Sequence, residues 1–128
     1  GVQTCALPIY EILTRVTVVD DDKDTVDIFS EFLKIYGIEV VGTGHNGKEA
    51  IELYKELKPD ITILDMKMPE YDGKYAIDGI KQINPDAHII VVTGFTEYSK
   101  ADLKVDALFY KPYEISEILK AIKNIESN

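Results

Sequence analysis

The sequence predicts a single α/β domain in which a parallel β-sheet carries helices on both faces. Short runs rich in β-branched residues alternate with longer segments whose apolar residues recur at helical spacing, along most of the 128-residue chain. The clearest run, residues 61–64, is apolar or β-branched throughout, which is typical of a strand buried on both faces. Pro69 follows it closely and has no N–H for a sheet ladder, so this strand must end before that residue.

Five strands and five helices are expected in alternation. The strands are predicted where β-branched and apolar residues are dense, at residues 15–19, 38–41, 61–64, 88–92 and 107–110. Helix-spaced apolar residues predict four helices, within residues 26–36, 50–57, 75–83 and 115–125. A weaker helix is expected at residues 97–103.

Local signals set the ends of these elements. Gly37 is expected to end the first helix, and prolines 59 and 85 follow the second and third. Asp22 or Asp24 is expected to cap the first helix at its amino end. Glycines at 42, 44 and 47 predict a loop after the second strand. No repeat or linker divides the chain, which favours one domain.

Composition excludes several classes of protein. Hydrophobic residues make up 45% of the chain and charged residues 29%, as in ordinary globular domains. The net charge of −9, without a basic cluster, argues against direct nucleic-acid binding. No apolar run approaches the roughly 18 residues that a membrane span needs. The only cysteine, Cys5, gives no disulfide framework, so a reducing, cytoplasmic setting is expected.

The first nine residues differ in character from the rest. Residues 1–9 resemble the translation of a common sequencing adaptor and carry no charged side chain. They also lack the basic start of a secretory signal peptide. Our hypothesis is that residues 1–9 are a non-native extension and that the domain occupies residues 10–128.

Polar residues of complementary chemistry stand at the carboxyl ends of four predicted strands. Residues 20–22 are three consecutive aspartates after the first strand, and Asp65 follows the third. Thr93 ends the fourth strand and Lys111 follows the fifth. If the first strand lies between the second and third, these groups converge where ligands bind in open parallel sheets.

This combination of side chains suits phosphoryl chemistry. Carboxylates packed together repel one another unless a cation neutralises them, and oxygen ligands suit Mg²⁺. A threonine hydroxyl and a lysine ammonium both suit phosphoryl oxygens. Asp65 is then the candidate nucleophile, a carboxylate that attacks phosphorus and becomes an acyl phosphate.

With these residues in place, the chain resembles the receiver domain of two-component response regulators over roughly residues 14–126. The matching blocks are Val-Val-Asp-Asp-Asp at 18–22, Leu-Asp-Met-Lys-Met-Pro at 64–69 with Asp-Gly at 72–73, Val-Val-Thr-Gly at 91–94 and Tyr-Lys-Pro at 110–112. Asn-Gly-Lys-Glu-Ala at 46–50 matches the usual start of the second helix. Each block is weakly specific alone, but four in this order and spacing are strongly specific.

The resemblance implies a flavodoxin-like, doubly wound sheet of five parallel strands in the order 2-1-3-4-5, flanked by five helices. It implies that a sensor histidine kinase or a phosphotransfer protein phosphorylates Asp65. It also implies Mg²⁺ as cofactor, held by Asp20, Asp21, Asp65 and the backbone carbonyl of Lys67.

The remaining family residues follow in the same way. Thr93 and Lys111 are implied to contact the phosphoryl group, and the Lys111–Pro112 peptide is expected to be cis. The family is not enzymatic beyond Mg²⁺-dependent self-phosphorylation and autodephosphorylation. The downstream target is a protein that the sequence does not name, and a monomer or a weak phosphorylation-dependent dimer is expected.

Two positions differ from the family pattern or add to it. Leu108 stands where the family usually has an aromatic switch residue, and the aromatics here are Phe109 and Tyr110. Coupling through another group, or a muted switch, is expected. Phe95 and Lys67 are predicted to flank the acyl phosphate and slow its hydrolysis, whereas His45 and His88 are expected to be structural or exposed.

Other functions fit these residues less well, and one alternative stays open. A calcium loop over residues 20–31 lacks the required glycine at its sixth position, and consecutive aspartates would repel the phosphate of a flavodoxin-type electron carrier. An aspartyl-phosphate phosphatase usually has a second aspartate where Lys67 stands. The serious rival is a non-phosphorylated receiver-like protein-interaction scaffold, which Leu108 keeps open.

Overall fold

The computed structural model describes residues 13–127, and its five strands form one parallel sheet in the order β2-β1-β3-β4-β5. This order confirms the predicted doubly wound α/β fold. The strands are β1 (Arg15–Val19), β2 (Glu39–Gly44), β3 (Ile61–Leu64), β4 (His88–Thr93) and β5 (Ala107–Tyr110). The helices are α1 (Lys23–Ile35), α2 (Gly47–Leu57), α3 (Gly73–Ile83), α4 (Lys100–Leu103) and α5 (Ile115–Glu126).

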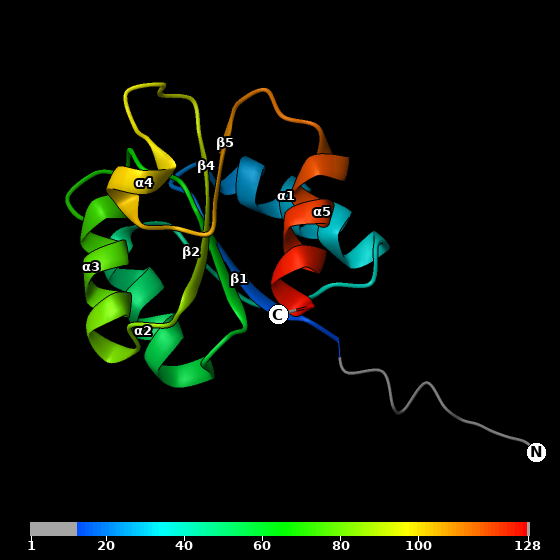
Figure 1. Cartoon of the computed structure of the whole chain (residues 1–128), viewed down its shortest axis with the longest axis horizontal. Coiled ribbons are helices and arrows are strands. Elements are labelled where there is room, and N and C mark those ends of the chain that lie inside the picture. Colours follow the sequence, from blue (N-terminus) through cyan, green and yellow to red (C-terminus); the bar gives the residue numbers. More distant parts are fainter. Residues whose placement is uncertain (1–12, 128) are drawn as a thin grey trace, which may run out of the picture.

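Helices cover both faces of the sheet, with α1 and α5 on one side and α2, α3 and α4 on the other (Figure 1). The alternation of side chains along each strand divides the apolar core in two. In β4, for example, Ile89 and Val91 pack with α2, α3 and α4, whereas Ile90 and Val92 pack with α1 and α5. All residues of β3 are buried, as predicted for a strand between two helical layers.

The register of the central strands aligns the residues that follow them. Val19 pairs with Leu64, so Asp20 and Asp65 both leave the sheet at the same level. Leu64 in turn pairs with Val91 of β4, and Thr93 pairs with Tyr110 of β5. The carboxyl ends of β1, β3, β4 and β5 therefore meet at one edge.

Two predicted elements have wrong boundaries. Gly42 and Gly44 lie in β2 and not in a loop, because glycine there lets α2 pack closely: a Cβ at Gly42 would meet Leu57 Cδ1 at 2.9 Å. The helix expected at 97–103 is a single turn that begins only at Lys100. Its cap is Ser99, whose Oγ accepts from the Asp102 N–H at 3.1 Å.

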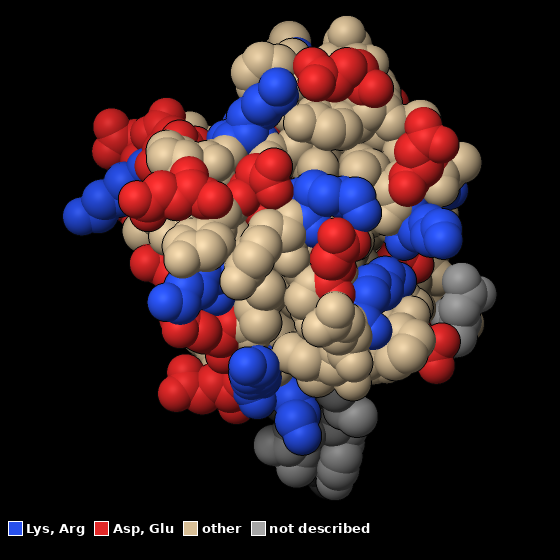
Figure 2. Space-filling model, turned by 90° about the vertical axis from the view of Figure 1, so that its left-hand side faces the viewer, with Lys and Arg blue, Asp and Glu red and all other residues tan. Residues whose placement is uncertain are grey.

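The predicted local signals otherwise hold. Asp22 caps α1, and Gly37, with a φ of 82°, follows the end of that helix. The Lys111–Pro112 peptide is cis, as expected. Residues 1–9 lie outside the described residues, so the adaptor hypothesis stays a prediction. Within residues 13–127, no helix has the length and apolar character to cross a bilayer. Figure 2 shows acidic and basic side chains interspersed on the face made by α2, α3 and α4.

Candidate functional site: an acidic pocket at the carboxyl edge of the sheet

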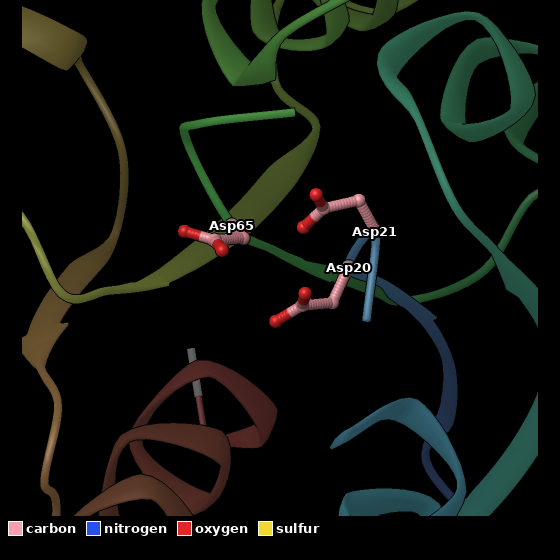
Figure 3. A group of neighbouring side chains, drawn as sticks. All are labelled: Asp20, Asp21 and Asp65. Carbon is pink, nitrogen blue, oxygen red and sulfur yellow. The ribbon is translucent and has the colours of Figure 1, made fainter. Parts of the chain in front are cut away.

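Three carboxylates converge beyond the ends of β1 and β3. Asp20, Asp21 and Asp65 each place one carboxylate oxygen within 4.8 Å of the others. Figure 3 shows the three side chains turned toward a common space from two adjacent loops. Asp20 and Asp65 are only 6% and 8% exposed, whereas Asp21 faces solvent. We call this group the acidic pocket.

Lys111 supplies the positive charge of the acidic pocket. Its Nζ lies 2.9 Å from Asp20 Oδ2 and 3.5 Å from Asp65 Oδ2. Burial by itself lowers the pKa of Lys111, but the hydrogen bond that Lys111 donates to Asp20 and the charge of Asp65 outweigh burial and raise that pKa above its ordinary value. The Lys111 ammonium is therefore charged at neutral pH. The backbone N–H of Lys111 donates to Thr93 O at 2.8 Å and so joins β5 to β4.

Backbone N–H groups orient the two buried carboxylates. Asp65 Oδ1 accepts from the Met66 N–H at 2.7 Å, and Asp20 Oδ1 accepts from the Asp22 N–H at 3.0 Å. Each of these carboxylates thus has one oxygen held by the backbone and the other beside Lys111. This leaves the Asp65 Oδ2 atom facing the Lys111 ammonium.

Asp21 is the least satisfied member of the acidic pocket. Burial, the hydrogen bond to Asp20 and the negative charges of Asp20 and Asp65 raise the pKa of Asp21. A hydrogen bond from its own backbone N–H opposes this rise in pKa. A cation between the three carboxylates would relieve this repulsion, and carboxylate oxygens are the donors that Mg²⁺ prefers. The donor set therefore fits Mg²⁺.

Thr93 and Phe95 stand at the carboxyl end of β4, on the same edge of the sheet as the acidic pocket. Thr93 is completely buried, and its Oγ1 accepts from the Phe95 N–H at 3.3 Å. Lys67, from the loop after β3, lies with its Nζ 4.8 Å from the centre of the Phe95 ring. The structure thus brings Lys67 and Phe95 together, as their predicted shared role requires.

Two residues that the sequence did not single out for the site contact it. Glu97 pairs with Lys67 at 3.5 Å, and His45 places Nδ1 at 3.1 Å from the backbone oxygen of Asp20. Neither position carried a signal in the sequence, because both contacts join loops that are far apart along the chain. The expectation of a structural role for His45 agrees with its backbone partner.

The position of the usual aromatic switch is filled differently here. Leu108 is half-buried and packs against the core beneath α2, α3 and α4. Tyr110 lies two residues further along β5, so its side chain is on the same face of the sheet. The Tyr110 hydroxyl donates to Tyr98 O at 2.7 Å and so joins β5 to the loop between β4 and α4.

The calcium-loop alternative does not fit this geometry. The Asp22 carboxylate accepts from the Asp24 N–H at 3.1 Å and from the Thr25 hydroxyl at 2.9 Å, so it caps α1. Asp24 and Glu31 lie within α1 itself. The acidic residues after β1 are therefore divided between the pocket and a helix cap.

The family model for the response regulator receiver domain matches residues 16–123, and the chain belongs to this family. Among known relatives, the chemotaxis protein CheY of Thermotoga maritima is 36% identical over 115 residues, which cover 87% of this chain and 96% of CheY. The response regulator VraR of Staphylococcus saprophyticus is 34% identical, and the match covers 84% of this chain and 54% of VraR.

Solved structures agree with this assignment. The response regulator TrrA of Thermotoga maritima, solved in complex with Mg²⁺ and BeF, superposes with a TM-score of 0.81 at 28% identity, covering 88% of this chain and 99% of TrrA. CheY from the CheX–CheY complex of Borrelia burgdorferi has a TM-score of 0.80 at 23% identity, with 87% of each chain covered. The latter similarity supports the fold alone, and both confirm the receiver-type sheet.

Proposed function

We propose that this receiver domain accepts a phosphoryl group on Asp65 from the phosphohistidine of a sensor histidine kinase or phosphotransfer protein. The observation that carries the proposal is the convergence of Asp20, Asp21 and Asp65 within 4.8 Å beside the Lys111 ammonium. A cluster of carboxylates around a buried aspartate is unfavourable for stability, because the negative charges repel one another. Such clusters are typical of functional sites, and here Asp65 has an oxygen available for reaction.

The side chains divide the reaction between them. Asp65 Oδ2 attacks phosphorus, the bond from phosphorus to the histidine nitrogen breaks, and an acyl phosphate forms. Lys111 moves its hydrogen bonds from the carboxylates to the phosphoryl oxygens, and the Thr93 hydroxyl donates to another of them. Met66 N–H keeps Asp65 Oδ1 in place during the transfer.

Asp20, Asp21, Asp65 and the backbone carbonyl of Lys67 would hold Mg²⁺ in this reaction. When bound, the ion neutralises negative charge on the carboxylates and on the phosphoryl oxygens. The presence of Mg²⁺ in the solved TrrA complex supports this choice of metal. Loss of the phosphoryl group by hydrolysis completes the cycle, and phosphorylation switches a surface that binds a downstream protein.

The alternative of a non-phosphorylated scaffold is not favoured. It would require none of the contacts that orient Asp65, yet both oxygens of this carboxylate are positioned by neighbours. Leu108 stands on β5 where the family usually has an aromatic residue, but this difference removes no group from the acidic pocket.

Substitution Asp65→Asn tests the proposal. The variant is expected to lose phosphorylation by acetyl phosphate with Mg²⁺, because an amide cannot attack phosphorus as a carboxylate does. Intact-mass spectrometry would measure the added phosphoryl group. Asp86→Asn, at an exposed aspartate outside the pocket, is the matched control and should be phosphorylated like the wild type. An unmodified wild-type chain would favour the scaffold.

A further inference from the structure

His45 lies at the acidic pocket, unlike the other histidine of the chain. Its Nδ1 is 3.1 Å from the backbone oxygen of Asp20. His88, in contrast, begins β4 at the opposite edge of the sheet, where its Nδ1 lies 3.1 Å from Asp106 Oδ1. The contact of His45 joins the loop before α2 to the first residue after β1.

The backbone of His45 is held by the start of α2. The His45 N–H donates to Glu49 Oε1 at 2.7 Å, and the Glu49 N–H donates to Asn46 Oδ1 at 2.9 Å. Asn46 thus caps α2, and Glu49 in its first turn holds the backbone of the residue before the cap. The imidazole is therefore presented to Asp20 from a defined helix start.

The chemistry of the contact fixes the role of each atom. A backbone carbonyl oxygen only accepts hydrogen bonds, so Nδ1 of His45 must carry the hydrogen. The neutral ring then has the Nδ1–H tautomer. Nδ1 donates to the Asp20 carbonyl oxygen whether the imidazole ring is neutral or charged.

The contact restrains the peptide between Asp20 and Asp21 from its carbonyl side. The Asp20 N–H donates to Gly44 O at 3.1 Å, so β2 and the loop after it hold Asp20 through both of its backbone polar groups. Because a peptide unit is planar, fixing the carbonyl also fixes the N–H and the Cα of Asp21, from which its side chain leaves the backbone.

Asp21 depends on this restraint more than its neighbours do. The carboxylates of Asp20 and Asp65 are each oriented by a backbone N–H and by Lys111. Asp21 is exposed, and its carboxylate lies within 4.8 Å of both of the others, a distance at which like charges repel one another.

We infer that His45 is a positioning residue whose Nδ1–H, bonded to the Asp20 carbonyl, aims the Asp21 carboxylate at the cation site. The inference rests on the proposed Mg²⁺-dependent function and adds a residue outside the carboxylate set. It assigns His45 no contact with the metal or with the phosphoryl group.

Substitutions of His45 separate the hydrogen bond from the bulk of the ring. In His45→Asn, the amide N–H₂ occupies nearly the place of Nδ1–H, whereas His45→Leu is similar in size and has no donor. Mg²⁺ affinity is measured from the amide resonances of Asp21 and Met66 by NMR. We expect the Kd of His45→Leu to rise about tenfold, as for other groups that orient metal ligands. His45→Asn and the matched control His88→Leu should remain near the wild type.

A second readout uses the wild-type chain without metal. The ring nitrogen resonances of neutral His45 are expected to show the Nδ1–H tautomer, and this measurement remains decisive even where a variant fails to fold. The Nε2–H tautomer would overturn the inference. So would an unchanged Kd in His45→Leu, or an equal loss of affinity in His45→Asn.

The two proposals fail in different ways. If the wild type binds Mg²⁺ and is phosphorylated on Asp65 while His45→Leu binds Mg²⁺ equally well, only the role of His45 is overturned. If the wild type binds no Mg²⁺, the proposed function is overturned, and the role of His45 falls with it.

Discussion

Identical side chains have different roles in this pocket because their surroundings differ. Asp65 is buried, with Met66 N–H on one oxygen and Lys111 near the other. Asp21 is exposed, and its pKa is raised by burial of part of its surface and by Asp20 and Asp65. In the proposed function, Asp65 is therefore the carboxylate that reacts, and Asp21 is a carboxylate that binds the cation.

At the same scale, Phe95 is predicted to protect the acyl phosphate from water. The ring is 44% exposed and carries the Lys67 ammonium on its face. Phe95→Ala removes this cover, so autodephosphorylation should accelerate several-fold. The rate is measured from the decay of phosphorylated chain after the donor is removed. Phe32→Ala, at a phenylalanine 45% exposed on α1, is the matched control, and an unchanged rate in Phe95→Ala would contradict the prediction.

At the level of elements, α2 is seated directly on the loop between β3 and α3. The Gly47 N–H donates to Tyr71 O at 2.6 Å, and a Cβ at Gly47 would collide with the backbone oxygen of Asp72. A residue with a Cβ cannot approach so closely unless the backbone moves. This contact between α2 and the β3–α3 loop affects the pocket, because His45 precedes the cap of α2 and Asp65 begins the β3–α3 loop.

Gly47→Ala is therefore expected to destabilise the fold. Alanine favours a helix over glycine by about 1 kcal/mol, but overpacking against backbone costs about 1–3 kcal/mol, and the collision should dominate. Urea unfolding measures the change. Gly94→Ala is the control, because a Cβ at Gly94 meets no atom within 4 Å. Equal stability of Gly47→Ala and the wild type would contradict this prediction, because α2 could then move away from the β3–α3 loop without cost.

On the scale of the whole molecule, the charge balance of the pocket links stability to pH and to metal. The pKa of Asp21 is raised in the folded chain, so its contribution to stability is present at acidic pH and is lost as pH rises through that pKa. At neutral pH the metal-free fold therefore holds a repelled carboxylate. A cation that binds only the folded chain stabilises it by mass action.

Asp21→Asn tests this balance. At pH 7 without metal, the variant should be slightly more stable than the wild type, by less than about 1 kcal/mol, because water screens an exposed charge. With Mg²⁺ added, the wild type should gain stability and the variant much less. Thermal unfolding with and without Mg²⁺ measures both effects. If Mg²⁺ stabilised the wild type and Asp21→Asn equally, Asp21 would not be a ligand of the cation.

The sequence by itself determined the order of the elements and, except for β2 and α4, where they lie. The apolar alternation placed all five strands and their helices, and Asp20, Asp65, Thr93 and Lys111 stood out because each follows or ends a buried run. Caps such as Asp22 and Gly37 were also visible, since a cap acts within a few residues. These features depend on short-range chemistry, which a linear pattern records.

Only the tertiary structure decided which loops touch. Gly42 proved to belong to β2 because Leu53 and Leu57 of α2 pack over it, and no local signal distinguishes such a glycine from one in a turn. The contacts of Lys67 with Glu97 and of His45 with Asp20 likewise join separate loops at the edge of the sheet. Their partners are set by strand order and register, which depend on long-range packing and leave no periodic trace in the chain.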